Sequence, residues 1–262
     1  MSRFIDKLNK VSRDTSQTMG FRMARQAPSE PGILLIASVS SGDAARLADY
    51  VEGADAVLLR PTKSLLTATT IQKIADSLRD IPWGVYLDDI DDKKAAVLFN
   101  AGCDFTVFTA ASAVTTAPEQ DNVGKIIQVE SSLDDGLLRA VNNLPVDAVM
   151  VTDVFEGEGS LLWHQLMIFQ HLTNMLTKPV IVPASLKATE SELKALWEAG
   201  VDGMVVETDT GKPGALKELR QIIGRLPPRS TRRRFKAEAL LPRTGGGESG
   251  TATPDEEEEE YE

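Results

Sequence analysis

The sequence predicts an α/β fold, a (β/α)8 TIM barrel with an N-terminal helical extension and a disordered C-terminal tail. Eight short runs rich in β-branched residues alternate with helical or loop segments, a pattern typical of a parallel sheet. Eight strands close a barrel, whereas a doubly wound open sheet more often stops at five or six. The expected strands cover residues 33–39, 54–60, 83–88, 103–109, 125–130, 146–153, 179–185 and 201–207.

Residues 1–30 form a separate segment before the barrel, which we expect over 31–226. Phe4, Ile5 and Leu8 recur at helical spacing, and a proline-containing linker follows them. We expect this helix to close the bottom of the barrel or to pack on a partner. Basic residues along its polar side leave a helix lying on a membrane surface as the alternative.

An internal repeat marks the even-numbered strands. Three of them open with glycine, one further residue and aspartate, and the fourth lacks only the glycine. The four aspartates are Asp55, Asp104, Asp147 and Asp202. The glycine would supply the left-handed turn that ends the preceding helix, and the aspartate would lie at the bottom of the barrel. Chemistry in these barrels occurs at the opposite end, so the repeat indicates a structural role.

Residues 227–262 have the composition of a disordered, charged tail. The formal charge of the chain is −11, but seven acidic residues lie within 255–262. The rest of the chain is therefore only mildly acidic, and no nucleic-acid partner is expected. The tail either keeps the protein in solution or binds a basic segment, in a partner or in its own arginine cluster.

A cytoplasmic location without a membrane span is the expectation from composition. No run of about 18 apolar residues occurs, and the first residues include no uninterrupted apolar stretch. The single cysteine, Cys103, cannot form an internal disulfide and opens an apolar run. We interpret it as a packing residue.

The C-terminal ends of the strands, where barrel enzymes place their chemistry, carry several charged residues. Asp88, Glu130 and Asp153 each end an apolar run, which makes them candidates for catalytic acids or bases. Arg60 and Lys63 could hold an anionic group of a substrate. Glu207 and Asp153 are the candidate ligands for Mg²⁺ or Mn²⁺, which prefer oxygen ligands.

Several other chemistries are disfavoured. No strand end carries histidine, which argues against zinc hydrolysis. No strand has an interior lysine, which argues against imine-forming aldolase chemistry. Nothing indicates a flavin or haem. Proton transfer beside a carbonyl and metal-held enolate formation remain.

The segment 161–176 reads as an unusually apolar helix. It contains both histidines, His164 and His171, seven residues apart on one face. A helix this apolar must pack against something. We therefore expect a homo-oligomer that uses this helix as a subunit contact.

The stretch KPVIVPAS at 178–185, followed by AGVDGMVV at 199–206, resembles the last quarter of the phosphate-binding barrels. That superfamily includes thiamine phosphate synthase and the ribulose-phosphate binders. The resemblance implies that the ends of the seventh and eighth strands grip a phosphate. The family's glycines are absent here, and Ala184-Ser185 and Glu207-Thr208 stand in their places.

The candidate substrate-binding residues lie at or just after the end of the second strand and near the ends of the seventh and eighth strands. A replacement anion site lies a few residues beyond the eighth strand, where glycine and lysine could form a nest, although ordinary capping of the last helix explains the same residues. The candidate substrate-binding residues are Arg60, Lys63, Ser185, Lys187, Thr208, Gly211 and Lys212.

Two classes of function follow. In the first, the protein is a lyase or isomerase acting on a small polar metabolite, phosphorylated or not, at the C-terminal rim. In the second, the barrel is a non-catalytic binding or assembly scaffold. The missing glycines favour the scaffold, and the charged rim favours the enzyme.

Overall fold

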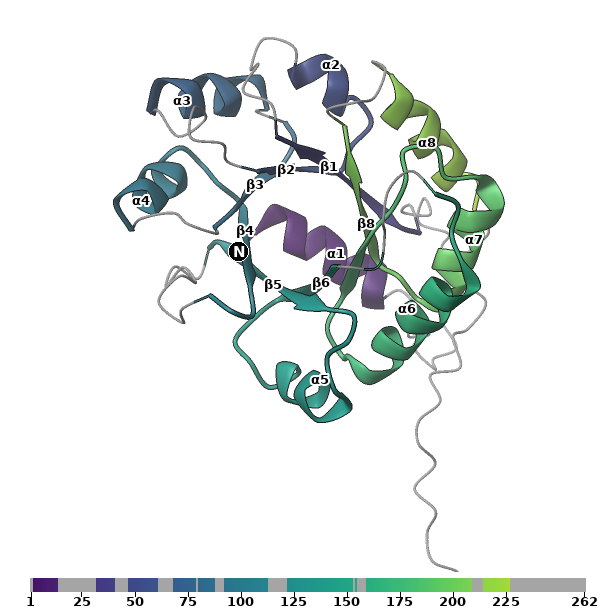
Figure 1. Cartoon of the computed structure of the whole chain (residues 1–262). Helices are drawn as coiled ribbons and strands as arrows, with labels where there is room; N and C mark the ends of the chain where they lie inside the picture. Colours follow the sequence, from purple (N-terminus) through teal and green to yellow (C-terminus); the bar gives the residue numbers. More distant parts are fainter. Residues whose placement is uncertain are drawn as a thin grey trace, which may run out of the picture. The chain divides into compact units, whose positions relative to one another are not determined.

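The computed structural model contains a closed barrel of eight parallel strands paired in sequence order, with β1 next to β8 (Figure 1). It describes residues 2–13, 32–40, 47–60, 68–78, 80–87, 92–112, 122–152, 154, 159–208 and 214–226. The strands are β1 (Leu34–Val39), β2 (Ala56–Leu59), β3 (Trp83–Tyr86), β4 (Phe105–Thr109), β5 (Gly124–Glu130), β6 (Ala148–Thr152), β7 (Val180–Pro183) and β8 (Gly203–Glu207). All eight expected strands are confirmed, in the expected order.

Helices surround the barrel, and one helix lies across its lumen in the view of Figure 1. The outer helices are α2 (Leu47–Val51), α3 (Ala68–Ser77), α4 (Asp92–Asn100), α5 (Asp135–Val141), α6 (Trp163–Met175), α7 (Glu190–Ala199) and α8 (Ala215–Ile223). Most strand residues are buried on both faces, as expected of strands between a packed interior and covering helices. No helix within the described ranges is long and apolar enough to cross a membrane.

The expected N-terminal helix is α1 (Arg3–Arg13), and it closes the bottom of the barrel, where the strands begin. Phe4 and Leu8 are fully buried, and the Phe4 ring lies 4.7 Å from that of Phe105 on β4. Gly124 leaves the room that α1 needs, because a Cβ on it would lie 2.5 Å from Cγ1 of Ile5. The helix is therefore part of the core. The linker after it lies outside the described residues.

The four repeated aspartates lie at the bottom, as predicted, each immediately before an even-numbered strand. Three of them form the same pair of backbone contacts with the preceding strand. Asp202, for example, donates its N–H to the carbonyl of Val180 and accepts the N–H of Val180 on its carboxylate, both at 3.0 Å. Asp55 makes this contact with Leu35, and Asp147 makes it with Lys125. The repeat thus joins the lower ends of neighbouring strands.

Asp104 departs from this pattern in a way that explains how α1 is held. Its N–H bonds to the carbonyl of Trp83 on the preceding strand, but its carboxylate turns to α1. There it accepts hydrogen bonds from Ser2 Oγ at 2.7 Å, the Arg3 N–H at 2.7 Å and the Phe4 N–H at 2.9 Å. A carboxylate at a helix N-terminus satisfies free N–H groups and complements the helix dipole.

The residues around these aspartates also behave as the sequence predicts. Gly53, Gly102 and Gly200 have φ between +92° and +97°, the left-handed turn that ends each preceding helix. Cys103 is buried, and its burial raises the pKa of the thiol, which makes it an inert packing residue. The expected tail, 227–262, lies outside the described residues.

Candidate active site at the mouth of the barrel

Alternate residues of each strand point into the barrel, and Gly203 shows which ones. A Cβ built on Gly203 would lie 3.5 Å from Cδ1 of Leu8 in α1, so this position faces the interior. Residues paired across a parallel ladder share a face. Gly203 pairs with Ile181, Ile181 with Met150, and Met150 with Gln128, so these side chains also face the interior. Along β8, every second residue from Gly203 faces inward, which includes Glu207. The ladder partner of Glu207 on β1 is Ser38, which therefore faces inward as well.

The same registers give relative heights along the barrel axis. From Ser38, ladder pairs lead through β2, β3 and β4 to Gly124 on β5. In the other direction, Ser38 pairs with Glu207 on β8. When the registers of β8 with β7, β7 with β6 and β6 with β5 are continued past the strand ends, the matching position on β5 is Ser132. The two positions reached on β5, Gly124 and Ser132, differ by eight residues, which is the shear number of a TIM barrel. Gln128 is the midpoint, so it lies opposite Ser38 at the same height.

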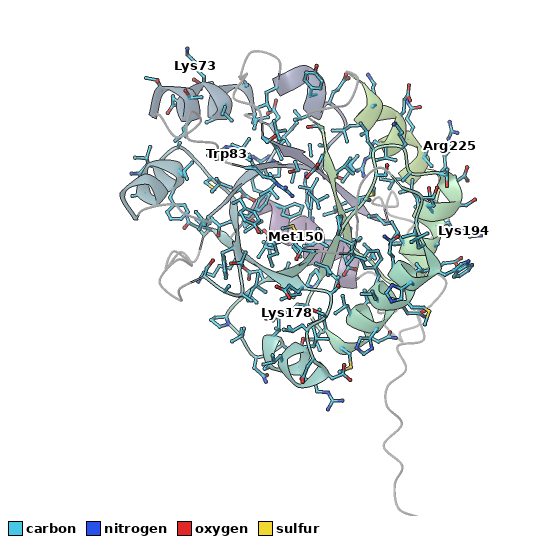
Figure 2. All side chains as sticks on the ribbon, in the orientation of Figure 1. Lys73, Trp83, Met150, Lys178, Lys194 and Arg225 are labelled. Atoms are coloured by element: carbon cyan, nitrogen blue, oxygen red, sulfur yellow. The ribbon has the colours of Figure 1, made fainter. Side chains whose placement is uncertain are left out.

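The inward side chains form layers of four, each from alternate strands. The layer nearest the mouth, here the rim layer, consists of Arg60, Thr109, Thr152 and Glu207. Below it lies the polar layer, which consists of Ser38, Tyr86, Gln128 and Pro183. The apolar layer beneath consists of Leu58, Val107, Met150 and Val205. Met150 lies in the middle of the ring of strands in Figure 2.

Two polar atoms in the polar layer are buried without a hydrogen-bond partner. They are the hydroxyl oxygen of Ser38, a residue 1 % exposed, and the amide oxygen of Gln128. Buried polar atoms are nearly always bonded, and leaving one unsatisfied costs about 1–3 kcal/mol. The two atoms belong to opposite strands of one layer. They are hydrogen-bonding atoms that the fold itself leaves unused. A third such atom among the described residues, Arg220 Nη1, lies on α8, where the same guanidinium bonds Asp55 through Nη2.

An ion pair between two predicted site residues lies above Ser38. Arg60 Nη1 is 3.2 Å from Glu207 Oε1, and the two side chains are 48 % and 72 % exposed. Their strands, β2 and β8, flank β1, so the pair spans the end of β1. The Thr208 N–H and hydroxyl both donate to the carbonyl of Ser38, each at 3.1 Å. This end of the barrel is thus closely bonded around the backbone of Ser38.

The structure places Arg60, Glu130 and Glu207 at the mouth, as expected, but brings only Arg60 and Glu207 into contact. Glu130 ends β5 and accepts a 3.4 Å hydrogen bond from Ser132 Oγ. Ser185 lies in the turn after β7, where its hydroxyl accepts the N–H of Lys187 at 3.2 Å. The predicted residues Asp88, Asp153, Lys63, Gly211 and Lys212 lie outside the described residues.

The expected divalent metal site is not assembled by the residues that the structure describes. Within the described ranges, no group of three histidine, cysteine, aspartate or glutamate side chains could hold a metal ion. Glu207 is paired with a guanidinium, which competes with a cation for its carboxylate. Asp153, the second predicted ligand, lies outside those ranges, so Mg²⁺ or Mn²⁺ binding stays a prediction.

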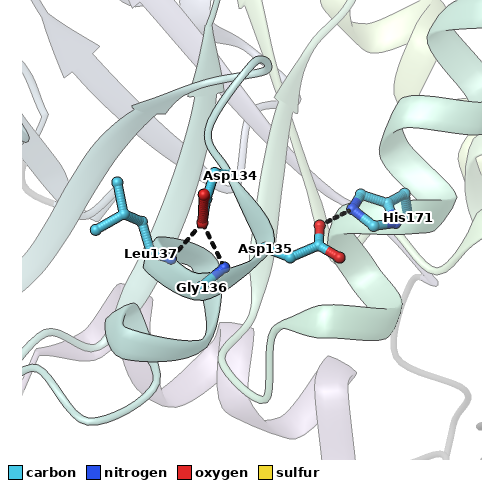
Figure 3. A network of polar contacts seen from close by, with 5 residues as sticks. All are labelled: Asp134, Asp135, Gly136, Leu137 and His171. Carbon is cyan, nitrogen blue, oxygen red and sulfur yellow. Dashed lines mark hydrogen bonds and ion pairs between the residues drawn. The ribbon is translucent and has the colours of Figure 1, made fainter.

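Two aspartates at the N-terminus of α5 make polar contacts within this helix and with α6 (Figure 3). Asp134 caps α5 by accepting the N–H of Gly136 at 2.6 Å and that of Leu137 at 3.2 Å. Asp135 lies 2.9 Å from Nε2 of His171 on α6, which joins the two helices. His171 therefore serves to connect α5 and α6 on the outer surface, and it takes no part in the mouth.

Sequence reasoning missed Gln128 and gave Ser38 no role. One signal could have identified Gln128. Along β5 the inward positions read Gly124, Ile126, Gln128 and Glu130, so a neutral polar residue interrupts the inward face one step before the strand end. Which face points inward is set by the register with the neighbouring strands, and the sequence does not state it.

No family model and no curated protein sequence matches the chain. Solved structures do match it. A mutant tryptophan synthase alpha-subunit from Pyrococcus furiosus aligns with a TM-score of 0.55 and 13 % identity, over 72 % of this chain and 96 % of that chain. A ligand-free tryptophan synthase from M. tuberculosis aligns with a TM-score of 0.57 and 12 % identity, over 86 % and 98 %. The likeness is one of fold.

Proposed function

We propose that this protein is a lyase or isomerase acting on a small polar metabolite, phosphorylated or not, bound at the mouth of the barrel. The observation that carries the proposal is the pair of buried, partnerless atoms, Ser38 Oγ and Gln128 Oε1, in one layer of the lumen. A folded protein retains such atoms at a cost unless a ligand satisfies them. The mouth is also where TIM-barrel enzymes place their active sites.

Acid–base chemistry at this site would come from carboxylates at the strand ends. Glu130 is the last residue of β5 and lies on the same inward face as Gln128, two residues nearer the mouth. Its carboxylate could therefore act as a general acid or base on a ligand bound at Gln128. Asp88 and Asp153 remain candidates for the same role, and Asp153 with Glu207 for holding Mg²⁺ or Mn²⁺. Arg60 would bind an anionic group once that group displaces Glu207.

A phosphate on the substrate would be held in a different way from that implied by the resemblance to the phosphate-binding barrels. At the end of β8 the Thr208 N–H already donates to Ser38, so it is engaged in the ladder. The grip would fall to Arg60, Lys63, Ser185 and Lys187, and to the proposed nest of Gly211 and Lys212. For a phosphorylated substrate, we propose these residues as the phosphate site.

The test is turnover by the full chain. Ribulose 5-phosphate, ribose 5-phosphate and dihydroxyacetone phosphate, which all carry a carbonyl, are incubated with the protein, with Mg²⁺ or with a chelator, and followed by ¹H and ³¹P NMR. We expect conversion of a phosphorylated compound that Gln128→Met lowers by 100-fold or more. The matched surface variant Gln72→Met on α3 should leave it unchanged. The proposal would be overturned if none of the compounds were converted and none of them raised the melting temperature of the protein.

A second candidate, an assembly scaffold, is favoured by the outer face of α6. Trp163 and Met167 are one turn apart and are 82 % and 66 % exposed, and Leu162 beside them is 60 % exposed. The helix contains no aspartate, glutamate, lysine or arginine. Interface cores are depleted in charge and enriched in tryptophan and methionine, and a charge-free patch can face a copy of itself without repulsion.

This candidate proposes a second copy of the chain as the occupant, with α6 as the subunit contact. Sedimentation analysis of the full chain should show a dimer that Trp163→Ser with Met167→Ser converts to a monomer, with little change in melting temperature. A wild-type monomer at 100 μM would overturn it. Turnover at the mouth by that monomer would leave the enzyme proposal as the better one.

A further inference from the structure

We propose that the ligand of the mouth enters with an uncharged, hydroxyl-bearing end, which is held between Ser38 and Gln128, and keeps any anionic group at the rim. The inference deepens the proposed function by naming the class of ligand, a sugar or polyol or its phosphate ester. It rests on the site proposed above, but not on the reaction proposed there.

The first step is the chemistry of the two partnerless atoms. The Gln128 amide oxygen accepts hydrogen bonds, and the Ser38 hydroxyl can both donate and accept. A ligand that satisfies both atoms must offer a hydrogen-bond donor to Gln128 and either a donor or an acceptor to Ser38. Hydroxyl groups do this without carrying charge. Because the two residues face each other at the same height, a chain of carbons bearing adjacent hydroxyls could contact both.

The second step is the absence of charge at this depth. All four side chains of the polar layer are uncharged, namely Ser38, Tyr86, Gln128 and Pro183. A carboxylate or phosphate placed there would be buried beside the Gln128 oxygen without a counter-charge in the layer. Desolvating an unpaired anion costs several kcal/mol, so the deep end of the ligand must be neutral.

The third step is the floor of the site. The apolar layer of Leu58, Val107, Met150 and Val205 lies directly beneath and offers no hydrogen bond. A hydroxylated end therefore stops at the polar layer. The interior of an eight-stranded TIM barrel is narrow and largely filled by side chains, so a ligand that enters from the mouth stands roughly along the axis.

The fourth step is the charge at the rim. The only cation in the rim layer is Arg60, whose side chain is 48 % exposed and paired with Glu207. An anionic group one layer above the hydroxyls can replace Glu207 on the guanidinium while remaining partly in water. The vertical order of apolar, neutral polar and charged side chains thus matches a polyol with its ester group outermost.

The test compares three phosphate esters and one salt by isothermal titration on the full chain. Ribitol 5-phosphate has the neutral hydroxylated end, pentyl phosphate has an apolar end of the same length, and 5-phosphoribonate has a carboxylate at that end. Inorganic phosphate reports the rim alone. We expect ribitol 5-phosphate to bind at least tenfold tighter than each of the other three.

The double variant Ser38→Ala with Gln128→Met should remove this preference and bind ribitol 5-phosphate and pentyl phosphate within about twofold of each other. Its matched control, Ser77→Ala with Gln72→Met, changes the same residue types on the exposed face of α3 and should keep the wild-type order. A melting curve for each variant verifies folding, and the single variants replace the double one if it unfolds.

The outcomes separate this inference from the enzyme proposal. Equal binding of pentyl phosphate and ribitol 5-phosphate by the wild type, or an unchanged preference in the double variant, overturns the inference even if turnover is found. A preference that depends on Ser38 and Gln128, without conversion of any compound, supports the inference and overturns the proposed catalysis.

Discussion

The two ends of the barrel treat their polar groups in opposite ways. At the bottom, each of the four repeated aspartates has its carboxylate bonded to backbone N–H groups. At the mouth, Ser38 and Gln128 keep buried oxygen atoms without partners. The bottom also has one buried atom without a partner, Arg220 Nη1, but the same guanidinium is bonded through Nη2 to Asp55 at 2.8 Å. The bonded carboxylates at the bottom stabilise the fold, and the two unsatisfied oxygen atoms at the mouth reduce its stability. The difference teaches that this barrel separates stability from binding along its axis.

The largest expected effect is at the bottom, where Asp104→Ala removes the acceptor for three donors at the start of α1. Bonds to a charged group contribute about 1.5–3 kcal/mol each, and they are not additive, so we expect a loss of roughly 3 kcal/mol or more. Urea unfolding of the variant measures it. Stability within 1 kcal/mol of wild type would show that α1 is held by its apolar face alone.

A second effect at the bottom tests how tightly α1 fills the barrel. Gly124→Ala would place a Cβ 2.5 Å from Cγ1 of Ile5 and 3.0 Å from Ser2 Oγ. Overpacking of this kind costs about 1–3 kcal/mol. Gly159→Ala is the control, since nothing lies within 4 Å of a Cβ there. Equal melting temperatures for the two variants would mean that α1 shifts freely.

A smaller effect is expected at the N-terminus of α7, where the carboxylate of Glu192 has a structural role outside the lumen. Glu192 accepts the N–H of Thr189 at 2.7 Å and that of Leu161, just before α6, at 2.7 Å. The hydrogen bond from the Thr189 backbone lowers the pKa of Glu192. Glu192→Gln should therefore cost about 1 kcal/mol at pH 7, the usual value of a helix cap.

The sign of the pKa shift sets the pH dependence of that loss. A lowered folded pKa gives stability that is present above the unfolded pKa of about 4.3 and is lost as pH falls through the folded value. Unfolding at pH 7 and pH 3 should show a difference between wild type and Glu192→Gln that shrinks at pH 3. A constant difference would mean that the charge of Glu192 has no part in it.

The sequence was sufficient for the fold because its signals are local and repeated. Each glycine–residue–aspartate opening, such as 200–202, specifies a helix end and a strand start within three residues. The site is different, because its geometry joins residues far apart in the chain. Arg60 meets Glu207 only because β2 and β8 both flank β1, and Gln128 faces Ser38 only because the barrel has a shear of eight.

Arg60 and Glu207 also show the limit of assigning roles from residue type. The sequence suggested separate tasks for them, anion binding and metal binding, and the structure pairs them at 3.2 Å. Charged residues at strand ends are expected on any soluble barrel. A neutral glutamine inside a strand is harder to explain by solubility, and that is why it carries more information about the site.

The most direct test of the separation between stability and binding is the unfolding free energy of Gln128→Met without ligand. Methionine is close in size to glutamine and removes the partnerless amide oxygen. The account predicts a variant at least as stable as wild type, with a gain of up to about 2 kcal/mol. Gln72→Met on α3 should remain within about 0.5 kcal/mol of wild type. A loss of more than 1 kcal/mol for Gln128→Met would show that the amide is satisfied within the fold, and would contradict the account.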